Sequence, residues 1–210
     1  MKKRIVIVDD HVSIRDMLIW ILMKDDCYDV IGEAGSGIEA MKVCGTCRPD
    51  LLILDLIIPC LSGVEVLRRV RKELPRTRVL IFSGACNGAL IKEALREQPH
   101  GFVEKMAGLK ILRHAISTIS GGGSYFSAEA IQLLCEMRGT TPRDSSLSAR
   151  EREILQMVAE GKSSKQICGL LNVALKTVEN HRANLMAKLG MHDVASLTRY
   201  AAGRGLVALE

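Results

Sequence analysis

The sequence has few aromatic residues and no long hydrophobic run. Phe, Trp and Tyr make up 3% of the 210 residues, so a core has to be built mainly from aliphatic side chains. No apolar run approaches the roughly 18 residues that a membrane-spanning helix needs. The basic start is followed by only four apolar residues before Asp9, which is too short for the core of a signal peptide. We therefore expect a cytoplasmic protein that does not associate with membranes.

The sequence also lacks the even number of cysteines that a disulfide-bonded protein usually has. Seven cysteines in a chain of this length argue against a disulfide framework. Cys44 and Cys47 have the C-x-x-C spacing, but no second pair of ligands with zinc-site spacing lies nearby. A redox pair would begin a helix, whereas this pair falls near the end of one. Packing or surface thiols are the favoured interpretation, and a role for the pair stays open.

No strong excess of one charge is present. The net charge is +5, with 18 Lys and Arg against 15 Asp and Glu in residues 1–120, and 11 against 9 in residues 121–210. This mild basicity permits nucleic-acid binding without indicating it. The length allows one large domain or two small ones.

What the first 120 residues do contain is a regular alternation of strands and helices. Short β-branched or apolar runs predict strands over residues 5–8, 28–33, 51–54, 79–82 and 101–103, and helical spacing predicts helices over residues 11–24, 37–47, 63–74, 88–96 and 109–120. Five strands that alternate with helices predict an α/β fold, with a parallel sheet covered by helices on both faces.

Polar residues follow the predicted strands at their carboxyl ends. They are Asp9 and Asp10, Asp55, Ser83, and Lys105. Because parallel strands end at one edge of the sheet, these side chains should converge there, which five independent structural caps would not require. Clustered carboxylates repel one another, and Mg²⁺ is the cation that oxygen ligands with room for water would hold. A carboxylate beside Mg²⁺, a lysine and a hydroxyl is suited to form an aspartyl phosphate.

These residues, together with Pro59, Gly63 and Phe102, resemble the receiver domain of bacterial two-component response regulators over residues 2 to about 120. The resemblance implies the flavodoxin-like strand order 2-1-3-4-5. It also implies that Asp55 accepts a phosphoryl group from a sensor histidine kinase.

The resemblance implies roles for the other site residues as well. Asp10, Asp55 and the backbone carbonyl of Ile57 would hold Mg²⁺, and Asp9 would support the metal through water. Lys105 would pair with the phosphoryl group, while Ser83 and Phe102 would shift on phosphorylation. Gly84 stands where the family usually has Ala, and Phe102 where many members have Tyr, so the loop after Ser83 could be looser and the ring lacks a hydroxyl.

A boundary between two domains is expected within residues 121–146. Four small residues over 121–124 favour flexibility, and a polar run over 139–146 interrupts the chain again. A short helix is predicted between them, over residues 127–138. We therefore predict a receiver domain over residues 1–120, a linker over 121–146 and a helical domain over 147–210.

The last residues read as four helices. Ser148 and Glu151 form a capping-box pattern at the first helix, and a helix over 163–171 is joined by about three residues to a basic one over 175–189. This arrangement predicts a helix-turn-helix, and a fourth helix follows over 192–202. Residues 147 to about 205 resemble the DNA-binding domain of LuxR-type (NarL/FixJ) regulators.

That resemblance places the helix over 175–189 in the DNA major groove. The residues that it assigns to DNA are Lys176, Thr177, Glu179, Asn180, Arg182, Ala183 and Lys188. Of these, Glu179, Asn180 and Ala183 would face base edges, whereas Arg182 and Lys188 would meet phosphates. The fourth helix would pack the domain and could also form a dimer that reads a two-fold-related site.

The sequence therefore predicts a DNA-binding transcriptional regulator, not an enzyme, that forms a homodimer when Asp55 is phosphorylated. One alternative is a regulator that binds DNA constitutively and uses the receiver domain only to dimerise. Another is an aspartyl-phosphate phosphotransferase, but Asp9 and Asp10 are adjacent and Ile57 follows Asp55 by two residues, so no general acid is evident. The stimulus, the kinase, the target genes and the direction of regulation are not encoded in these patterns.

Overall fold

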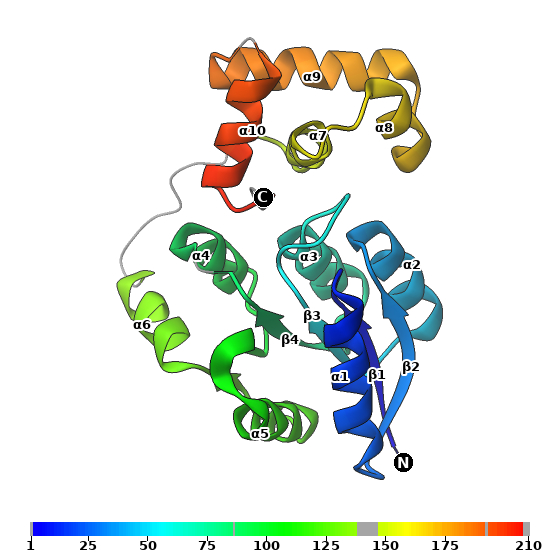
Figure 1. Ribbon diagram of the computed structural model, residues 1–210, viewed down its shortest axis with the longest axis vertical. Coiled ribbons are helices and arrows are strands. Elements are labelled where there is room, and N and C mark those ends of the chain that lie inside the picture. Colours follow the sequence, from blue (N-terminus) through cyan, green and yellow to red (C-terminus); the bar gives the residue numbers. More distant parts are fainter. Residues whose placement is uncertain (1, 86, 138–146, 192, 208–210) are drawn as a thin grey trace.

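The computed structural model describes residues 2–85, 87–137, 147–191 and 193–207. An α/β domain lies at one end of the molecule and a helical domain at the other (Figure 1). The α/β domain contains β1 (Lys3–Val8), α1 (Val12–Met23), β2 (Tyr28–Ala34), α2 (Gly37–Cys47), β3 (Leu51–Leu54), α3 (Gly63–Glu73), β4 (Arg78–Ser83), α4 (Gly88–Arg96), β5 (Gly101–Glu104), a 3₁₀ turn (Lys105–Ala107), α5 (Leu109–Ser120), β6 (Tyr125–Phe126) and α6 (Ala128–Met137).

The sheet is parallel throughout and has the order β2-β1-β3-β4-β5-β6. The predicted flavodoxin-like order is therefore confirmed. The prediction of five strands missed β6, a two-residue strand that pairs with Gly101 and Phe102. Two residues are too few to show an alternating pattern. The glycines before β6 form a turn in which the Gly121 and Gly123 amides donate to the carbonyls of Ser117 and Thr118.

The two faces of the sheet carry separate cores. Ile5 and Ile7 of β1 pack with α1 and α5, whereas Val6 and Val8 pack with α2, α3 and α4 on the opposite face. All four of these side chains are at most 1% exposed. Burial on both faces explains why the strands read as continuous apolar runs rather than alternating ones.

The helical domain contains α7 (Ala149–Ala159), α8 (Ser164–Leu171), α9 (Leu175–Leu189) and α10 (Val194–Gly203). The predicted capping box at α7 is confirmed, since the Ser148 hydroxyl accepts from the Glu151 amide and the Glu151 carboxylate accepts from the Ser148 amide. A left-handed Asn172, with φ of 51°, ends α8 before the short turn into α9. The predicted helix-turn-helix is thus present.

Helix α6 is the last element of the α/β domain along the chain and packs against α4 (Figure 1). The polar run over 139–146 and the last residue of the predicted helix over 127–138 fall outside the described residues. So does His192, where the fourth helix of the C-terminal domain was predicted to begin. Within the described part of the chain, no helix combines the length and hydropathy that a membrane span requires.

The C-x-x-C pair lies at the end of α2. Cys44 is buried, and Cys47 is half-buried with its Sγ 3.7 Å from the Ile31 carbonyl oxygen. Burial raises the pKa of the Cys44 thiol to about 12. A protonated thiol is a poor metal ligand and a poor nucleophile, which favours the packing interpretation.

The ring of His100 is expected to make stability depend on pH. Its Nδ1 accepts from the Val79 amide at 2.9 Å, and burial, followed by the charges of Arg78 and Arg71, lowers its pKa from 6.5 to about 4. The folded state therefore binds fewer protons than the unfolded state between these values, so this contribution to stability is full above pH 6.5 and is lost toward pH 4. Urea unfolding at stepped pH should show this slope, and His100→Asn should flatten it. An unchanged slope in that variant would contradict the assignment.

Candidate phosphoacceptor site and nucleic-acid interface

The polar residues predicted at the strand ends meet at one edge of the sheet. The strands are in register there, with Val8 opposite Leu54 and Leu54 opposite Ile81. Asp9 and Asp55 follow β1 and β3 directly, Ser83 is the last residue of β4, and Lys105 follows β5. The short apolar strands thus place these side chains together without a long loop.

Asp55 is buried and has partners on both carboxylate oxygens. The Ser83 hydroxyl and the Ile57 amide donate to Oδ1, the latter at 3.2 Å, and the Lys105 ammonium lies 2.6 Å from Oδ2. Lys105 lies equally close to Oδ2 of Asp9. Burial lowers the pKa of Lys105, but Asp55 and Asp9 outweigh that effect and raise it above the ordinary value. The lysine therefore stays charged and partly neutralises the two carboxylates.

A divalent cation fits the same cluster. Asp9, Asp10, His11 and Asp55 each offer one ligand atom, and these atoms lie within 4.8 Å of one another. Asp9 and Asp55 are buried, whereas Asp10 and His11 are exposed, so the cluster opens to solvent on one side. Three carboxylates in this geometry match the oxygen ligands that Mg²⁺ requires.

His11 was not predicted as part of the site. Its Nδ1 lies 2.8 Å from Oδ1 of Asp10 and 3.2 Å from Oδ1 of Asp9. Its position directly after the two aspartates is the signal that could have found it.

Gly63 explains why α3 can begin so close to Asp55. A Cβ at Gly63 would lie 2.1 Å from the Asp55 carbonyl oxygen, a distance that no side chain tolerates. The Gly63 amide donates to the Leu56 carbonyl at 3.0 Å, which closes the loop between β3 and α3. We call residues 55–62 the β3–α3 loop.

Phe102 lies in β5 and is fully buried. A phenyl ring has no polar atom to bring to solvent, so burial is its favourable position. The shift of this ring and that of Ser83 on phosphorylation stay predictions.

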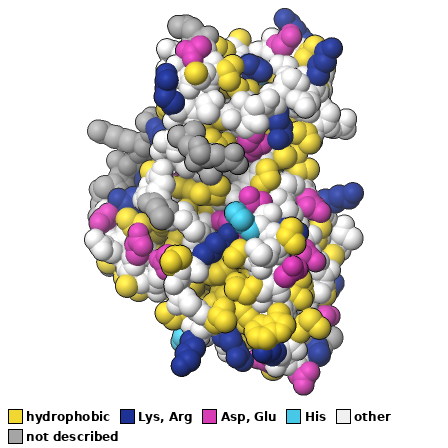
Figure 2. Space-filling view, in the orientation of Figure 1, with side chains coloured by type: hydrophobic (Ala, Val, Ile, Leu, Met, Phe, Trp, Pro, Cys, Tyr) yellow, Lys and Arg dark blue, Asp and Glu magenta, His cyan; other side chains and the backbone are white. Residues whose placement is uncertain are grey.

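The predicted DNA-contact residues lie along α9. Lys176, Glu179, Asn180, Ala183 and Lys188 are exposed, and Thr177 and Arg182 are half-buried. Helix α9 lies at the end of the molecule far from the sheet, where Figure 2 shows several Lys and Arg side chains.

The two cations predicted to meet phosphates have partners inside the helical domain. Arg182 donates to the Ser164 hydroxyl at 3.1 Å, and the Lys188 ammonium lies 2.8 Å from Oε2 of Glu151. These contacts use one nitrogen of the Arg182 guanidinium and one oxygen partner of the Lys188 ammonium, so both groups keep further donors for a phosphate. Of the three cations of α9, Lys176 is the one with no such partner among the described contacts, and it is exposed.

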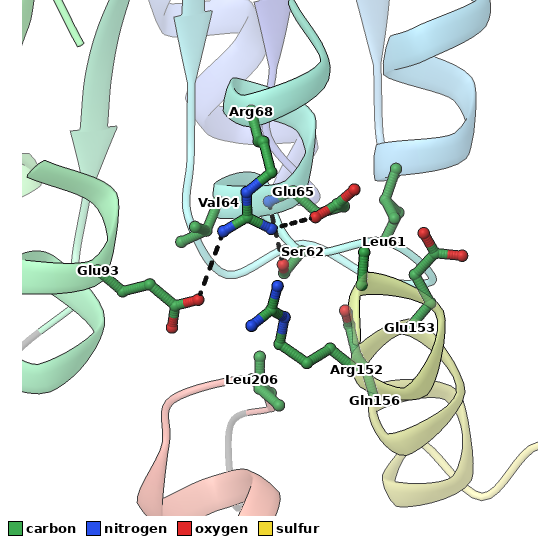
Figure 3. Close-up of a pocket in the computed structure, with 11 residues that line it drawn as sticks. Leu61, Ser62, Val64, Glu65, Arg68, Glu93, Arg152, Glu153, Gln156 and Leu206 are labelled. Atoms are coloured by element: carbon green, nitrogen blue, oxygen red, sulfur yellow. Dashed lines mark hydrogen bonds and ion pairs between the residues drawn. The ribbon is translucent and has the colours of Figure 1, made fainter. Parts of the chain in front are cut away.

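A contact between the domains was not predicted from the sequence. Helix α7 faces the β3–α3 loop and α3 of the other domain, and a narrow pocket between them is lined by Leu61, Glu65, Arg152 and Gln156 among others (Figure 3). No local sequence pattern predicts these contacts, because polar residues on a helix are equally compatible with exposure to solvent.

Two family models match the chain. Residues 5–117 match the response regulator receiver domain, and residues 145–201 match the bacterial regulatory proteins of the luxR family. Together these two segments span both structural domains.

Curated relatives match over nearly the whole length. The chain is 32% identical over 207 residues to the transcriptional regulatory protein MctR of Rhizobium johnstonii, covering 99% of this chain and 96% of that protein. It is 34% identical over 193 residues to the DNA-binding transcriptional activator DevR/DosR of Mycobacterium tuberculosis, covering 90% and 88%.

Solved structures have the same fold. RcsB of Salmonella enterica serovar Typhimurium, bound to a promoter in the presence of a phosphomimetic, superimposes with a TM-score of 0.63 at 22% identity, covering 97% of this chain and 99% of that one. The response regulator ChrA superimposes with a TM-score of 0.54 at 28% identity, covering 98% and 99%.

Proposed function

The chain belongs to the bacterial response regulators that join a receiver domain to a LuxR-type domain, and from this we propose that phosphorylation of Asp55 by a sensor histidine kinase controls its binding to DNA. The observation that carries the proposal is the pairing of a buried Asp55 with Lys105 and Ser83 beside Asp9 and Asp10. We infer a cytoplasmic location, because the proposed function requires access to DNA.

The proposed chemistry is transfer of one phosphoryl group. A carboxylate oxygen of Asp55 forms a bond to phosphorus as the bond from phosphorus to the kinase histidine breaks, and the imidazole nitrogen retains the electron pair. Lys105, which already lies 2.6 Å from Asp55, would pair with the phosphoryl oxygens. The Ser83 hydroxyl would then donate to the phosphoryl group instead of the carboxylate.

Asp10, Asp55 and the carbonyl of Ile57 would hold Mg²⁺, and Asp9 would support it through water. The bound cation supplies positive charge to the phosphoryl oxygens. Asp9 and Asp55 share Lys105 in the present structure, so metal and lysine together would balance the carboxylates and the incoming phosphoryl charge.

We propose that α9 enters the major groove. Glu179, Asn180 and Ala183 would face base edges from the exposed side of the helix, with Lys176 and Thr177 beside them. Arg182 and Lys188 would meet phosphates. A homodimer of the phosphorylated chain would read two half-sites about one helical turn apart.

The exposure of α9 also favours a second candidate function. The contact with the α/β domain is made by α7 and by the end of α10, where Asn87 donates to the Gly203 carbonyl at 3.0 Å, whereas the predicted base-facing residues of α9 are exposed (Figure 1). A regulator that binds DNA constitutively, with the receiver domain used only to dimerise, would have this arrangement as well.

Phosphate uptake by the purified chain tests the proposal. With a small phosphodonor such as acetyl phosphate and Mg²⁺, we expect one acid-stable, base-labile phosphate per chain, as an acyl phosphate requires. Chelation of the metal should abolish uptake, because the carboxylate cluster then lacks its balancing charge. Uptake of equal extent with a chelator present, or a base-stable product, would contradict the proposed site.

A further inference from the structure

Two side chains at the end of α7 form hydrogen bonds with backbone groups of the β3–α3 loop. Gln156, which is 2% exposed, donates from Nε2 to the Ile58 carbonyl at 2.8 Å. Glu160 accepts from the Cys60 amide at 2.9 Å. Nε2 of Gln156 also donates to Oε1 of Glu160 at 2.8 Å. The two α7 side chains thus form one hydrogen-bonded unit on either side of Pro59.

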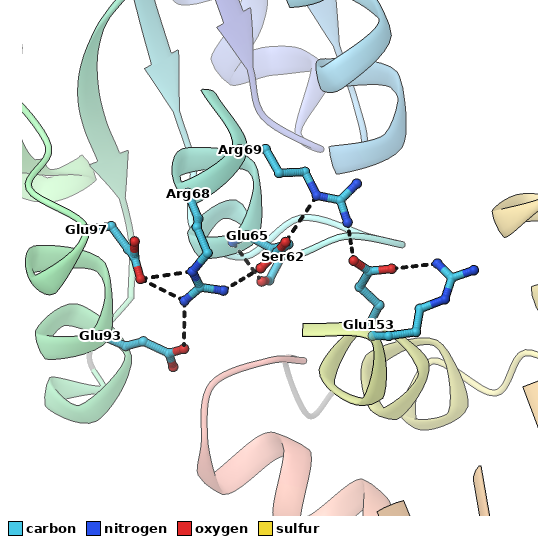
Figure 4. Close-up of polar contacts among 8 residues, drawn as sticks. Ser62, Glu65, Arg68, Arg69, Glu93, Glu97 and Glu153 are labelled. Carbon is cyan, nitrogen blue, oxygen red and sulfur yellow. Dashed lines mark hydrogen bonds and ion pairs between the residues drawn. The ribbon is translucent and has the colours of Figure 1, made fainter. Parts of the chain in front are cut away.

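A group of charged residues fixes α7 against α3. Arg69 of α3 pairs with Glu153 of α7, whose side chain is 4% exposed, and also with Glu65 at 3.1 Å (Figure 4). Glu153 pairs in addition with Arg150 at 2.8 Å. Because these charges are partnered on both sides of the contact, they fix the register of the two helices more than they add stability.

We propose that Gln156 and Glu160 of the C-terminal domain are positioning residues of the Asp55 site. They restrain the β3–α3 loop, so that docking of α7 and occupation of the site by metal and phosphoryl group favour each other. This inference rests on the proposed function, because it assigns the Ile57 carbonyl and Asp55 to the metal.

The residue that Gln156 contacts is adjacent in sequence to the residue proposed to bind the metal. Ile58, which accepts from Gln156, follows Ile57 directly, and the Ile57 amide donates to Oδ1 of Asp55. A movement of the Ile58 peptide therefore changes the position of the carbonyl proposed as a metal ligand. No intervening element is needed to carry the effect.

Cys60 shows that the loop conformation needs support. It has a φ of 72°, in the left-handed region that residues other than glycine seldom adopt. Such a residue persists when its surroundings over-determine it. The hydrogen bond from its amide to Glu160 is one of the contacts that do so.

The contact between α7 and the α/β domain does not bury the face of α9 that is proposed to read DNA. Helix α7 lies toward the α/β domain, and α9 lies on the far side of it (Figure 1). The two side chains therefore act on the loop of the phosphoacceptor domain and leave the predicted base-facing residues exposed.

Titration of the full-length chain with MgCl₂ by calorimetry tests the inference. Gln156→Ala and Glu160→Ala should each weaken Mg²⁺ binding about three- to tenfold, because the freed loop must be ordered when the metal binds. Glu160→Gln, which keeps an acceptor for the Cys60 amide, should retain most of the affinity. Glu160 caps the end of α7 rather than lying inside it, so its variants test the inference even where Gln156→Ala affects folding.

Gln132→Ala is the matched control, since Gln132 is exposed on α6 and its recorded side-chain contact is to Glu136 on the same helix at 3.5 Å. It should leave Mg²⁺ affinity unchanged. As a second readout, amide exchange at Cys60 should slow on adding Mg²⁺ to the wild type and respond less in Glu160→Ala, since coupling is reciprocal.

The outcomes separate the two claims. Wild-type affinity in both alanine variants, with the wild type binding Mg²⁺ normally, would overturn the inference and leave the proposed function intact. A wild type that neither binds Mg²⁺ nor takes up phosphate would overturn the proposed function and the inference with it.

Discussion

The Asp55→Asn protein is expected to take up no phosphate and to show no phosphorylation-dependent change in DNA binding. The neutral amide of asparagine has no anionic oxygen that could attack phosphorus. The remaining carboxylates, Asp9 and Asp10, would not substitute, because Asp9 is held by Lys105 and the Asp55 position alone has both Lys105 and Ser83 as partners. Phosphate uptake from acetyl phosphate, followed by a DNA mobility shift, measures both effects.

The substitution should not unfold the domain. Asparagine has nearly the volume of aspartate, and it removes one of several clustered negative charges. Asp29→Asn is a suitable control, since Asp29 is exposed on β2, away from the site, and should behave like the wild type. Phosphate uptake by Asp55→Asn at the wild-type rate would show that another residue is the acceptor.

The Asn180→Ala protein is expected to lose about 1–3 kcal/mol of specific DNA affinity, or roughly 5- to 150-fold, because a side-chain amide can pair with one base through two hydrogen bonds. Asn180 is exposed on the first half of α9, where recognition helices contact base edges. Affinity for unrelated DNA should be unchanged, so specificity at the contacted base pair should relax. Titration of a selected site and of a scrambled site measures both.

Two variants on the same helix sharpen this result. Asn184→Ala, one turn further along α9 and also exposed, should have a much smaller effect, because Asn184 is not among the residues proposed to face base edges. Lys188→Ala, at a cation proposed to meet a phosphate, should weaken binding to both DNAs alike and reduce the salt dependence by about one phosphate contact. Equal losses on the specific and scrambled sites in Asn180→Ala would contradict base readout by this residue.

The sequence predicted the parts of the fold that local patterns determine. Buried strands such as residues 51–54 are short apolar runs, and helices such as α7 begin with a capping pattern that the structure contains. Because a parallel sheet brings strand ends to one edge, the clustering of Asp9, Asp55 and Lys105 followed from strand order alone. The roles of these residues in phosphoryl transfer remain predictions.

What the sequence did not reveal depends on contacts between distant segments. The hydrogen bond from Gln156 to Ile58 joins residues 98 positions apart, and neither residue type signals it. Strand β6 exists because Tyr125 and Phe126 meet the edge of β5, and two residues carry no periodicity of their own. The internal partners of Arg182 and Lys188 likewise depend on how α8 and α7 pack on α9.

Selection from random DNA by the purified full-length protein directly tests whether Asp55 controls DNA binding, with Mg²⁺ present and with or without beryllofluoride as a mimic of the aspartyl phosphate. We expect enrichment of a two-fold-related site only with the mimic, and none by Asp55→Asn under either condition. Equal enrichment of the same site without the mimic would contradict control by Asp55 and support constitutive binding.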